Sequence, residues 1–473
     1  MICFFNKLSI PQELKVDISA RTRAGAEFFK KEEVISIEPE TDKTLEFKLP
    51  GVSEYGYYDL YVDVYGKDDG EKKAESFCEF ALINEPPPGT RNPKTSIINH
   101  VRIGRMGDSL INLEMIDRAG FSGARSEVSW NLYETEPGVK ALPENYVKEV
   151  EGRRDRNIKH LEIIAYDNKA LKVGNPPVSD EELRLFTQFA VDVVGDLIEV
   201  YGDNIEVEIW NEYNNSPGHF NERGATPEDY AKMLKYTYPA IKAKYPNVFV
   251  WGLNMYKINT QWAERVFAAG GLDYMDGISL HPYNSNATPD SGGQIAQTAE
   301  LKEIIKKYTD KDIKLLATEW GFSSMGYGAF PDNMNQGSYI VRQQVLNSAY
   351  DLYESIYWYT ANDGGDMKNS LEYNFGLMRG PDTKVPYGVK PSYLAIANYN
   401  SFMVDAKFVD MTDIGDDVRA YRFKLADGRD CLVAWKETAG NEMCAVNLGT
   451  DSITLKDMYG NEKNLGAVEG AFN

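Results

Sequence analysis

The chain has 473 residues, of which 42% are hydrophobic and 26% are charged, and its formal net charge is −21. This length predicts two or three domains, and the composition is that of a globular protein rather than a disordered or fibrous one. The acidic excess excludes a nucleic acid as partner and argues against an anionic membrane surface, because both are bound through basic patches.

The first residues, MICFFNKLSIPQELKV, contain an apolar run that is too short for the core of a signal peptide. No run of about 18 apolar residues follows in the chain, so we expect no membrane partner. The location stays open between the cytoplasm and a secreted protein written without its leader.

Residues 1–86 alternate apolar and polar side chains in short runs such as TLEFKL, YYDLYVDVYG and SFCEFALI. Patterns of period two, separated by turns that contain Gly, Asp and Lys, predict a β-sandwich-like accessory domain. The sequence NEPPPG at 84–89 interrupts regular structure and is typical of a linker.

Residues 87–402 alternate short apolar strands with longer amphipathic stretches such as EELRLFTQFAVDVVGDLIEVYG. The eight strand candidates are Ile97–Arg105, Gly123–Glu127, His160–Tyr166, Ile205–Trp210, Val248–Leu253, Gly277–His281, Lys314–Glu319 and Ser355–Tyr359. Eight such units predict an α/β fold of the (β/α)8 TIM barrel type. The alternative is a doubly wound open sheet, which normally carries a Gly-rich phosphate turn after its first strand. The first turn here, GRMGD at 104–108, lacks that motif, so the barrel is favoured.

Residues 403–473 return to period-two runs such as VRAYRFKL and DCLVAWKE and predict a C-terminal β module. Cys431 and Cys444 either face each other across a hairpin or remain separate thiols, because four cysteines are too few for a disulfide scaffold. The four histidines show no metal-binding spacing, so zinc catalysis has no support.

Two glutamates end strands of the predicted barrel. Glu212 follows the strand IEVEIW, and Glu319 follows IKLLAT. Active sites of TIM barrels lie at the carboxyl ends of the strands, so the two carboxyl groups should face each other there. Such a pair, about 5–5.5 Å apart, is what a retaining glycoside hydrolase needs as nucleophile and acid/base. Arg125 and Tyr283 are candidate donors that would keep the nucleophile ionised. The alternative for Arg125 is an ordinary ion pair with Glu127.

The segments EIWNEYN and LLATEWGF resemble the two signatures of the clan A glycoside hydrolases, which are retaining (β/α)8 enzymes. Within the clan, ARSEVSWNLYETEPG and IAYDNK are most similar to family 39 and its relatives. The resemblance covers about residues 97–400 and is more specific for the clan than for the family. Tyr213 departs from it, since many members carry Pro after the first glutamate.

The resemblance implies a role for each matching residue. Glu212 would be the acid/base and Glu319 the nucleophile. The others would contact the sugar or support the nucleophile: Asn211 at the 2-hydroxyl, Arg125 and Tyr283 at the nucleophile, His281 beside them, and Trp358 as the floor of the −1 subsite.

Further candidates for substrate contact come from their positions near strand ends. Trp358 and Trp320 either contact the sugar or pack in the core, and Trp130 and Tyr166 are candidate walls of the cleft. Asp167 and Asn168 end the third strand, where a polar pair either grips sugar hydroxyls or caps a turn.

The sequence therefore predicts a retaining glycosidase that cleaves β-type bonds of oligo- or polysaccharides by double displacement, with a carbohydrate as its partner. This reaction requires neither a metal nor an organic cofactor. The alternatives are a transglycosylase with the same site and a carbohydrate-binding protein on a catalytically retired barrel. The sugar, the choice between endo and exo action and the oligomeric state stay open, because the loops after the strands determine specificity.

Overall fold

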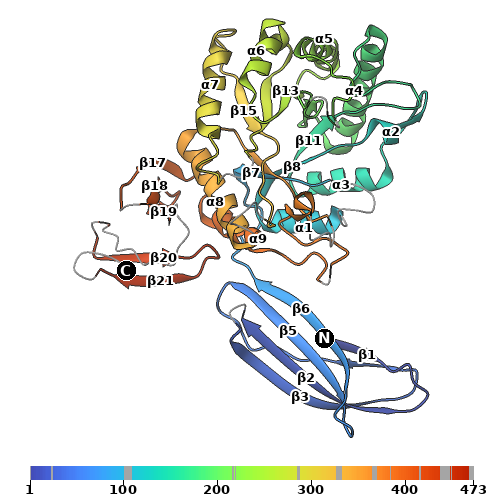
Figure 1. Cartoon of the computed structure of the whole chain (residues 1–473), viewed down its shortest axis with the longest axis vertical. Helices are drawn as coiled ribbons and strands as arrows, with labels where there is room; N and C mark the ends of the chain where they lie inside the picture. The colour runs from blue at the N-terminus through green and yellow to red at the C-terminus, as the bar shows by residue number, and fades with distance from the viewer. Residues whose placement is uncertain are drawn as a thin grey trace.

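The computed structural model describes residues 2–22, 25–100, 109–215, 218, 220–284, 288–325, 333–364, 370–383, 385–414, 417–436, 448 and 450–467. These residues form an N-terminal β module, a central barrel and a C-terminal β module, which follow one another along the chain (Figure 1).

The N-terminal module contains an antiparallel sheet in the order β3-β2-β5-β6 and a separate pair of strands, β1 and β4. Their bounds are β1 Ile2–Phe5, β2 Gln12–Thr22, β3 Glu27–Ile37, β4 Asp42–Leu45, β5 Gly56–Gly66 and β6 Lys72–Leu82. Alternate residues of β2 and β5, such as Val16, Ile18, Val62 and Val64, pack with Leu45 of β4. Successive side chains of a strand point to opposite faces, so this alternation buries one face of the sheet against the β1–β4 pair.

The barrel is closed, and its eight strands are parallel in the order β7-β8-β11-β12-β13-β14-β15-β16. The strand bounds are β7 Asn92–Ile98, β8 Phe121–Ser126, β11 Lys159–Ile164, β12 Glu206–Ile209, β13 Phe249–Tyr256, β14 Gly277–His281, β15 Lys314–Ala317 and β16 Ile356–Trp358; a small pair, β9 Glu134–Glu136 and β10 Val139–Lys140, follows β8. The helices are α1 Ser109–Arg118, α2 Trp130–Tyr133, α3 Glu144–Asp155, α4 Asp180–Tyr201, α5 Pro227–Lys244, α6 Thr260–Ala268, α7 Gln294–Lys306, α8 Asn333–Tyr350 and α9 Pro391–Phe402, with 3-10 turns η1 Gly271–Tyr274 and η2 Leu371–Asn374.

The first barrel strand begins earlier than the apolar pattern predicted. The sequence indicated Ile97–Arg105, whereas β7 is Asn92–Ile98, and residues 101–108 lie outside the described part of the chain. The polar start of the strand is held by Asn400 of α9, whose Oδ1 accepts hydrogen bonds from Asn92 Nδ2 (2.9 Å) and Thr95 Oγ1 (3.2 Å). These contacts extend the strand into residues that carry no apolar signal.

Helix α4 shows why the amphipathic stretches form the outer layer. Ser179 and Glu182 form a capping box that satisfies free backbone N–H groups at its start. Its buried residues recur at helical spacing and pack against the strands: Leu183, Phe186, Phe189, Ala190, Val193, Val194 and Leu197. The predicted fold, a TIM barrel with flanking β modules, is confirmed.

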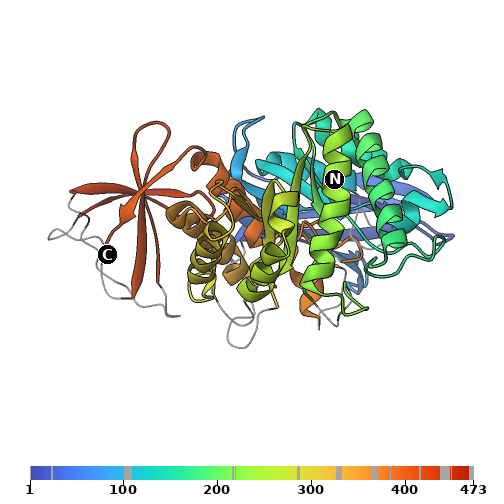
Figure 2. The ribbon, with the colours of Figure 1, turned by 90° about the horizontal axis from the view of Figure 1, so that it is seen from above.

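The C-terminal module has a three-stranded sheet and a hairpin. The sheet contains β17 Lys407–Met411, β18 Val418–Lys424 and β19 Asp430–Lys436, and the hairpin contains β20 Ser452–Lys456 and β21 Glu462–Gly466. The module lies at one end of the molecule beside α8 (Figure 1, Figure 2). Cys431 is half-buried, and Cys444 lies outside the described residues, so the predicted alternatives for this pair stay open.

The two β modules touch each other through the turn between β20 and β21. The side-chain oxygen of Asn461 accepts from the backbone N–H of Tyr55 (2.7 Å), and its Nδ2 donates to the Tyr55 carbonyl (2.9 Å). Asn398 of α9 donates to the Met458 carbonyl (3.2 Å) in the same turn and accepts from Asn84 Nδ2 (2.9 Å). The modules at both ends of the described chain therefore meet at one barrel helix.

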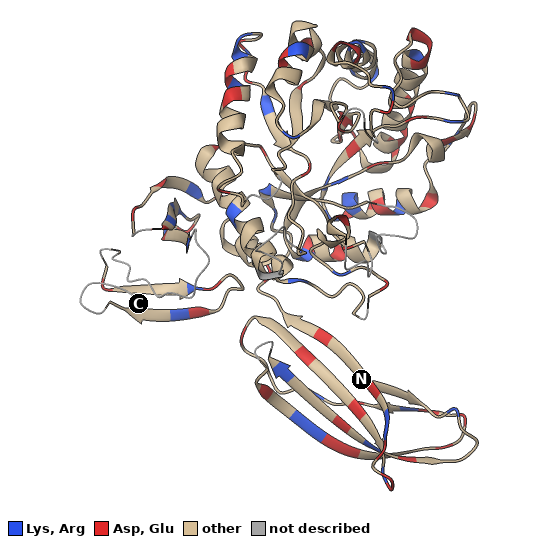
Figure 3. Cartoon of the chain, in the orientation of Figure 1, with Lys and Arg blue, Asp and Glu red and all other residues tan. Residues whose placement is uncertain are grey.

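Charged residues of both signs are distributed over the barrel helices and the N-terminal strands (Figure 3). Many Lys side chains have a carboxylate beside them, as in Lys15–Glu32 (3.2 Å) and Lys72–Asp63 (2.8 Å). Local pairing therefore neutralises much of the basic charge and leaves the acidic excess. Among the helices of the described residues, none is long and apolar enough to cross a membrane.

Candidate active site

The polar residues that the sequence predicted to act together lie at the carboxyl ends of the barrel strands. Arg125 lies near the end of β8, and His281 ends β14. Asn211 and Glu212 follow β12, and Glu319 follows β15. Because the eight strands are parallel, these ends surround a single mouth of the barrel.

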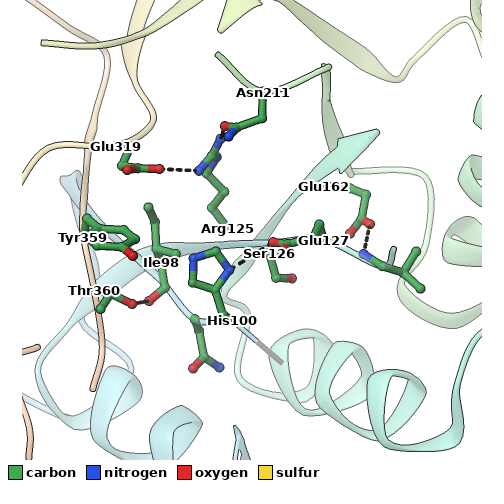
Figure 4. A network of polar contacts seen from close by, with 12 residues as sticks. Ile98, His100, Arg125, Ser126, Glu127, Glu162, Asn211, Glu319, Tyr359 and Thr360 are labelled. Carbon is green, nitrogen blue, oxygen red and sulfur yellow. Dashed lines mark hydrogen bonds and ion pairs between the residues drawn. The ribbon is translucent and has the colours of Figure 1, made fainter. Parts of the chain in front are cut away.

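Arg125 connects several of these groups and is 1% exposed. Its Nε donates to Glu208 (2.5 Å), one terminal nitrogen donates to Glu319 (3.2 Å), and the other donates to Asn211 Oδ1 (2.9 Å) and lies 3.5 Å from His281 Nε2. Figure 4 shows its guanidinium between Glu319 and Asn211. Burial opposes the charged form, but Glu208 and Glu319 raise the pKa of Arg125 above its ordinary value, so it stays cationic.

Glu319 is held by two donors. Its Oε2 accepts from Arg125, and its Oε1 accepts from the hydroxyl of Tyr283 (3.2 Å). Burial and the charge of Glu319 raise the pKa of Tyr283, so this phenol remains a donor. The side chain of Glu319 keeps 16% of its surface exposed, so this carboxylate is both fixed and accessible at the mouth.

Glu212 lies on the other side of the same group. Its Oε1 is 2.8 Å from His281 Nδ1, and its Oε2 accepts from Asn215 Nδ2 (3.2 Å). Its backbone φ is +49°, in the left-handed region that a glutamate rarely adopts, and its N–H donates to the Asn254 carbonyl (2.8 Å). Strain of this kind persists only where the surroundings impose it, and it concentrates at functional sites.

The two carboxyl groups are close neighbours. One oxygen of Glu212, one oxygen of Glu319 and a ring nitrogen of His281 all lie within 4.8 Å of one another. Carboxylate and imidazole atoms at this spacing are of the types that bind divalent cations. Arg125, however, already places a positive charge against Glu319, so a metal would have to compete with a buried guanidinium.

Burial and proximity shift the proton affinities of the two carboxyl groups in opposite directions. Burial raises the pKa of Glu319, and the nearby charge of Glu212 raises it further. His281 and Arg125 lower this pKa, but their effect is the smaller one. Burial also acts on Glu212, but the hydrogen bond and charge of His281 outweigh it, and the pKa of Glu212 falls below its ordinary value. These directions are the reverse of the order expected for an ionised nucleophile at Glu319 and a protonated acid at Glu212.

Glu208 contributes to the site and was not predicted from the sequence. It lies on β12 and is fully buried, and among the described residues it forms its hydrogen bond with Arg125. A signal was available, because a glutamate at a barrel-facing position of an apolar strand requires a cationic partner. The alternation in IEVEIW predicts a strand but does not by itself mark Glu208 as a residue of the site.

His100 and Glu127 form a second carboxylate–imidazole pair at the mouth that the sequence did not single out. His100 Nδ1 lies 3.0 Å from Glu127 Oε2, and the two side chains are 12% and 8% exposed. The ring of His100 meets that of Tyr359 edge-on at 6.0 Å, and Figure 4 shows both near Arg125 and Glu319. Because the first strand was predicted to extend to Arg105, His100 fell inside it rather than after its end.

Several predicted contacts lie in the core. Trp130 is fully buried and stacks on Phe189 at 4.7 Å. Asn168 is also fully buried and donates to the carbonyls of Trp130 (3.2 Å) and Glu134 (2.9 Å), the arrangement of a turn cap. The backbone carbonyl of Asp167 accepts from Asn131 (2.9 Å). For these three residues the structure provides a packing or capping contact, and sugar contact stays a prediction.

Trp358 and Trp320 lie closer to the mouth but are also buried, with 1% and 2% of their surface exposed. The indole N–H of Trp358 donates to the Phe375 carbonyl (3.0 Å), and Phe322 lies near both rings. The role of Trp358 as the floor of a subsite stays a prediction, because its ring is covered here.

No known family profile matches the chain, and no curated protein matches it either. Solved structures do. The structure of a family 39 glycoside hydrolase from the gut symbiont Bacteroides cellulosilyticus WH2 has a TM-score of 0.79 and 22% identity, and the match covers 99% of this chain and 97% of that one.

Two further structures match most of the chain. A monomeric β-xylosidase from Caulobacter crescentus CB15 has a TM-score of 0.55 and 18% identity, with 76% of each chain covered. A family 39 glycoside hydrolase from Xanthomonas axonopodis pv. citri has a TM-score of 0.52 and 16% identity, covering 72% of this chain and 73% of that one. The chain therefore has the fold of the family 39 glycoside hydrolases, from the N-terminal β module through the barrel to the C-terminal β module.

Proposed function

We propose that the protein is a retaining glycoside hydrolase that cleaves β-glycosidic bonds, with Glu319 as the nucleophile and Glu212 as the acid/base. The observation that supports this most is the pair of carboxyl groups with oxygens within 4.8 Å at the mouth of a (β/α)8 barrel. Retaining enzymes place their two carboxyl groups about 5–5.5 Å apart, whereas inverting enzymes separate them by about 6.5–9.5 Å to admit a water molecule.

The contacts of each carboxylate favour this division of roles. Glu319 has a cationic donor in Arg125 and a phenolic donor in Tyr283, which hold it in one orientation as an anion. Glu212 contacts His281, a group that can exchange a proton with it. Asn211, fixed by Arg125, is available to donate from its Nδ2 to a sugar hydroxyl.

The reaction has two steps. In the first, an oxygen of Glu319 forms a bond to the anomeric carbon while the bond to the leaving oxygen breaks, and the proton of Glu212 moves to that oxygen. In the second, Glu212 takes a proton from water, whose oxygen bonds to the anomeric carbon and releases Glu319. The products are two hydroxyl-bearing sugars or a sugar and an alcohol, and both glutamates return to their first state.

For this reaction the proton must lie on Glu212 when substrate is bound, although the contacts within the protein raise the pKa of Glu319 and lower that of Glu212. Positive charge that develops at the anomeric carbon stabilises the ionised form of Glu319 and moves the shared proton to Glu212. Once Glu319 is esterified its negative charge is absent, which lowers the pKa of Glu212 and makes it a base for water.

The proposed substrate is a β-linked oligo- or polysaccharide. One matched protein is named a β-xylosidase, which makes β-xylosides the first class to test. The test is a panel of activated aryl β-glycosides, with NMR detection of the first-formed anomer. We expect retention of configuration for the substrate that is turned over. Inverted product would contradict the proposal.

Variants test the assignment of roles. Glu319→Ala should abolish turnover, whereas Glu212→Ala should keep part of it for substrates whose leaving group needs no protonation. Glu354→Gln, at an exposed carboxylate beside Lys314 at the opposite end of the barrel, is the matched control. Wild-type turnover by Glu319→Ala, or tight sugar binding without turnover by the unaltered protein, would exclude this function.

A further inference from the structure

Asp290 joins the C-terminal module to the barrel. Its Oδ1 accepts a hydrogen bond from the indole N–H of Trp435 on β19 (3.0 Å), and its Oδ2 pairs with the guanidinium of Arg342 on α8. The guanidinium lies over the Trp435 ring at 5.4 Å and over the Tyr339 ring at 5.1 Å. The side chains of Asp290 and Arg342 are each 9% exposed, so this clamp of Asp290, Arg342 and Trp435 is largely shielded from water.

Asp290 belongs to the connection between β14 and α7, which also contains Tyr283. A hydrogen bond closes the part of this connection next to α7, where the buried side chain of Gln294 donates to the Pro289 carbonyl. Gly292 in the same part of the connection lies against the side chain of Asn284. A Cβ at position 292 would come within 3.2 Å of the Asn284 Cβ. Asp290 is the neighbour of Pro289 in the chain and Asn284 is the neighbour of Tyr283, so these two contacts link the segment of Asp290 to the segment of Tyr283.

Tyr283 donates to Glu319 (3.2 Å), and a small displacement of such a donor is expensive in catalysis. We propose that the clamp makes the C-terminal module part of the catalytic machinery: Trp435 and Asp290 are positioning residues that fix the connection carrying Tyr283. This inference rests on the proposed function of Glu319. It gives the C-terminal module a role beyond covering the barrel.

A purely structural role for the clamp would have a different consequence. If Trp435 only attached the module, its loss would lower thermal stability and leave the turnover of the folded protein unchanged. Val433 provides the comparison, because it lies on the same strand, packs against the same hydrophobic core and is not part of the clamp. Val433→Ala therefore weakens attachment without touching the clamp.

The test uses Trp435→Phe in the full chain, which keeps an aromatic ring over Arg342 and removes the N–H that binds Asp290. We expect kcat on the best aryl glycoside to fall about five- to tenfold, with KM within about twofold, because the donor to the nucleophile is displaced. Hydrogen exchange of residues 288–294 should become faster in the absence of substrate. Asp290→Asn is the second variant and should show both effects more strongly, whereas Val433→Ala should show neither.

The outcomes separate this inference from the proposed function. A wild-type protein that turns over no glycoside would contradict the proposed function. An active wild type whose Trp435→Phe variant keeps the wild-type kcat and the wild-type exchange would overturn the inference. Faster exchange without a fall in kcat would overturn it as well, since the clamp would then hold a segment that catalysis does not use.

Discussion

The buried carboxylate of Glu208 accepts a hydrogen bond of 2.5 Å from Nε of Arg125, and the same guanidinium contacts Glu319 at 3.2 Å. One cation thus serves two carboxylates, one inside the barrel and one at its mouth. The second oxygen of Glu208 has no hydrogen-bond partner among the described residues, so Arg125 alone compensates this buried charge. The charge that Arg125 presents to Glu319 therefore depends on Glu208.

Glu208→Gln tests this dependence. The amide keeps the shape but removes the negative charge, so the guanidinium acts more strongly on Glu319 and lowers the pKa of that carboxyl. We expect the acidic limb of kcat/KM to move to lower pH and kcat to fall about tenfold, since a more stabilised anion is a weaker nucleophile. The control is Glu206→Gln on the same strand, whose carboxylate binds Trp251 Nε1 (2.8 Å). An unmoved acidic limb in Glu208→Gln would contradict this account.

A second prediction concerns the coupling between the two glutamates. The charge of Glu212 raises the pKa of Glu319, so its removal must lower that pKa. With Glu212→Gln and a substrate whose leaving group needs no proton, we expect the acidic limb to shift to lower pH than in the wild type. The measurement is a pH series of kcat/KM with this substrate for both proteins. A shift to higher pH would show that the two groups are not coupled in this way.

Glu127 and His100 give a prediction about substrate affinity. Both lie at the mouth beside Arg125 and Glu319, where a carboxylate can accept from sugar hydroxyls remote from the cleaved bond (Figure 4). Glu127→Gln should raise KM about tenfold and change kcat less, because such a contact is present in the ground state and the transition state alike. His100→Asn should act in the same direction. Equal losses in kcat and kcat/KM would instead assign the pair to transition-state stabilisation.

Glu182 provides a prediction about stability. Burial opposes its ionised form, but hydrogen bonds from Ser179, Arg223 and Val178 outweigh this and lower its pKa to about 2. The pKa in the folded state lies below that of the unfolded chain, so the stabilisation is complete above about pH 4.5. It is lost as the pH falls toward 2.

Glu182→Gln should therefore lower the free energy of unfolding by about 1 kcal/mol at pH 7, a value kept small because solvent screens the site. The difference from the wild type should shrink between pH 4.5 and pH 2. Chemical denaturation followed by tryptophan fluorescence measures it. Glu181→Gln, in the same turn of α4 but outside the capping box, is the control. A difference that stays constant over this pH range would contradict the assignment.

The barrel and the central residues of the site could be predicted because strand ends are visible in the sequence. Glu212 and Glu319 each follow an apolar run, and parallel strands bring such ends together. Glu208 and the His100–Glu127 pair were not predicted, since recognising them requires the direction of each side chain and the exact end of each strand. Trp130 and Asn168 show the converse, because polar and aromatic residues near strand ends are also used for packing and capping.

The turn at 457–461 binds Tyr55 of the N-terminal module and Asn398 of the barrel, and it belongs to the C-terminal hairpin. The three parts of the described chain thus meet at this turn, so shortening the chain from either side removes contacts that the remaining parts use. Deleting residues 1–85 would remove the hydrogen bonds that Tyr55 forms with the hairpin. Deleting the hairpin would uncover α9 and the N-terminal sheet. Either truncation should loosen the region around α9, where Asn400 anchors the first barrel strand.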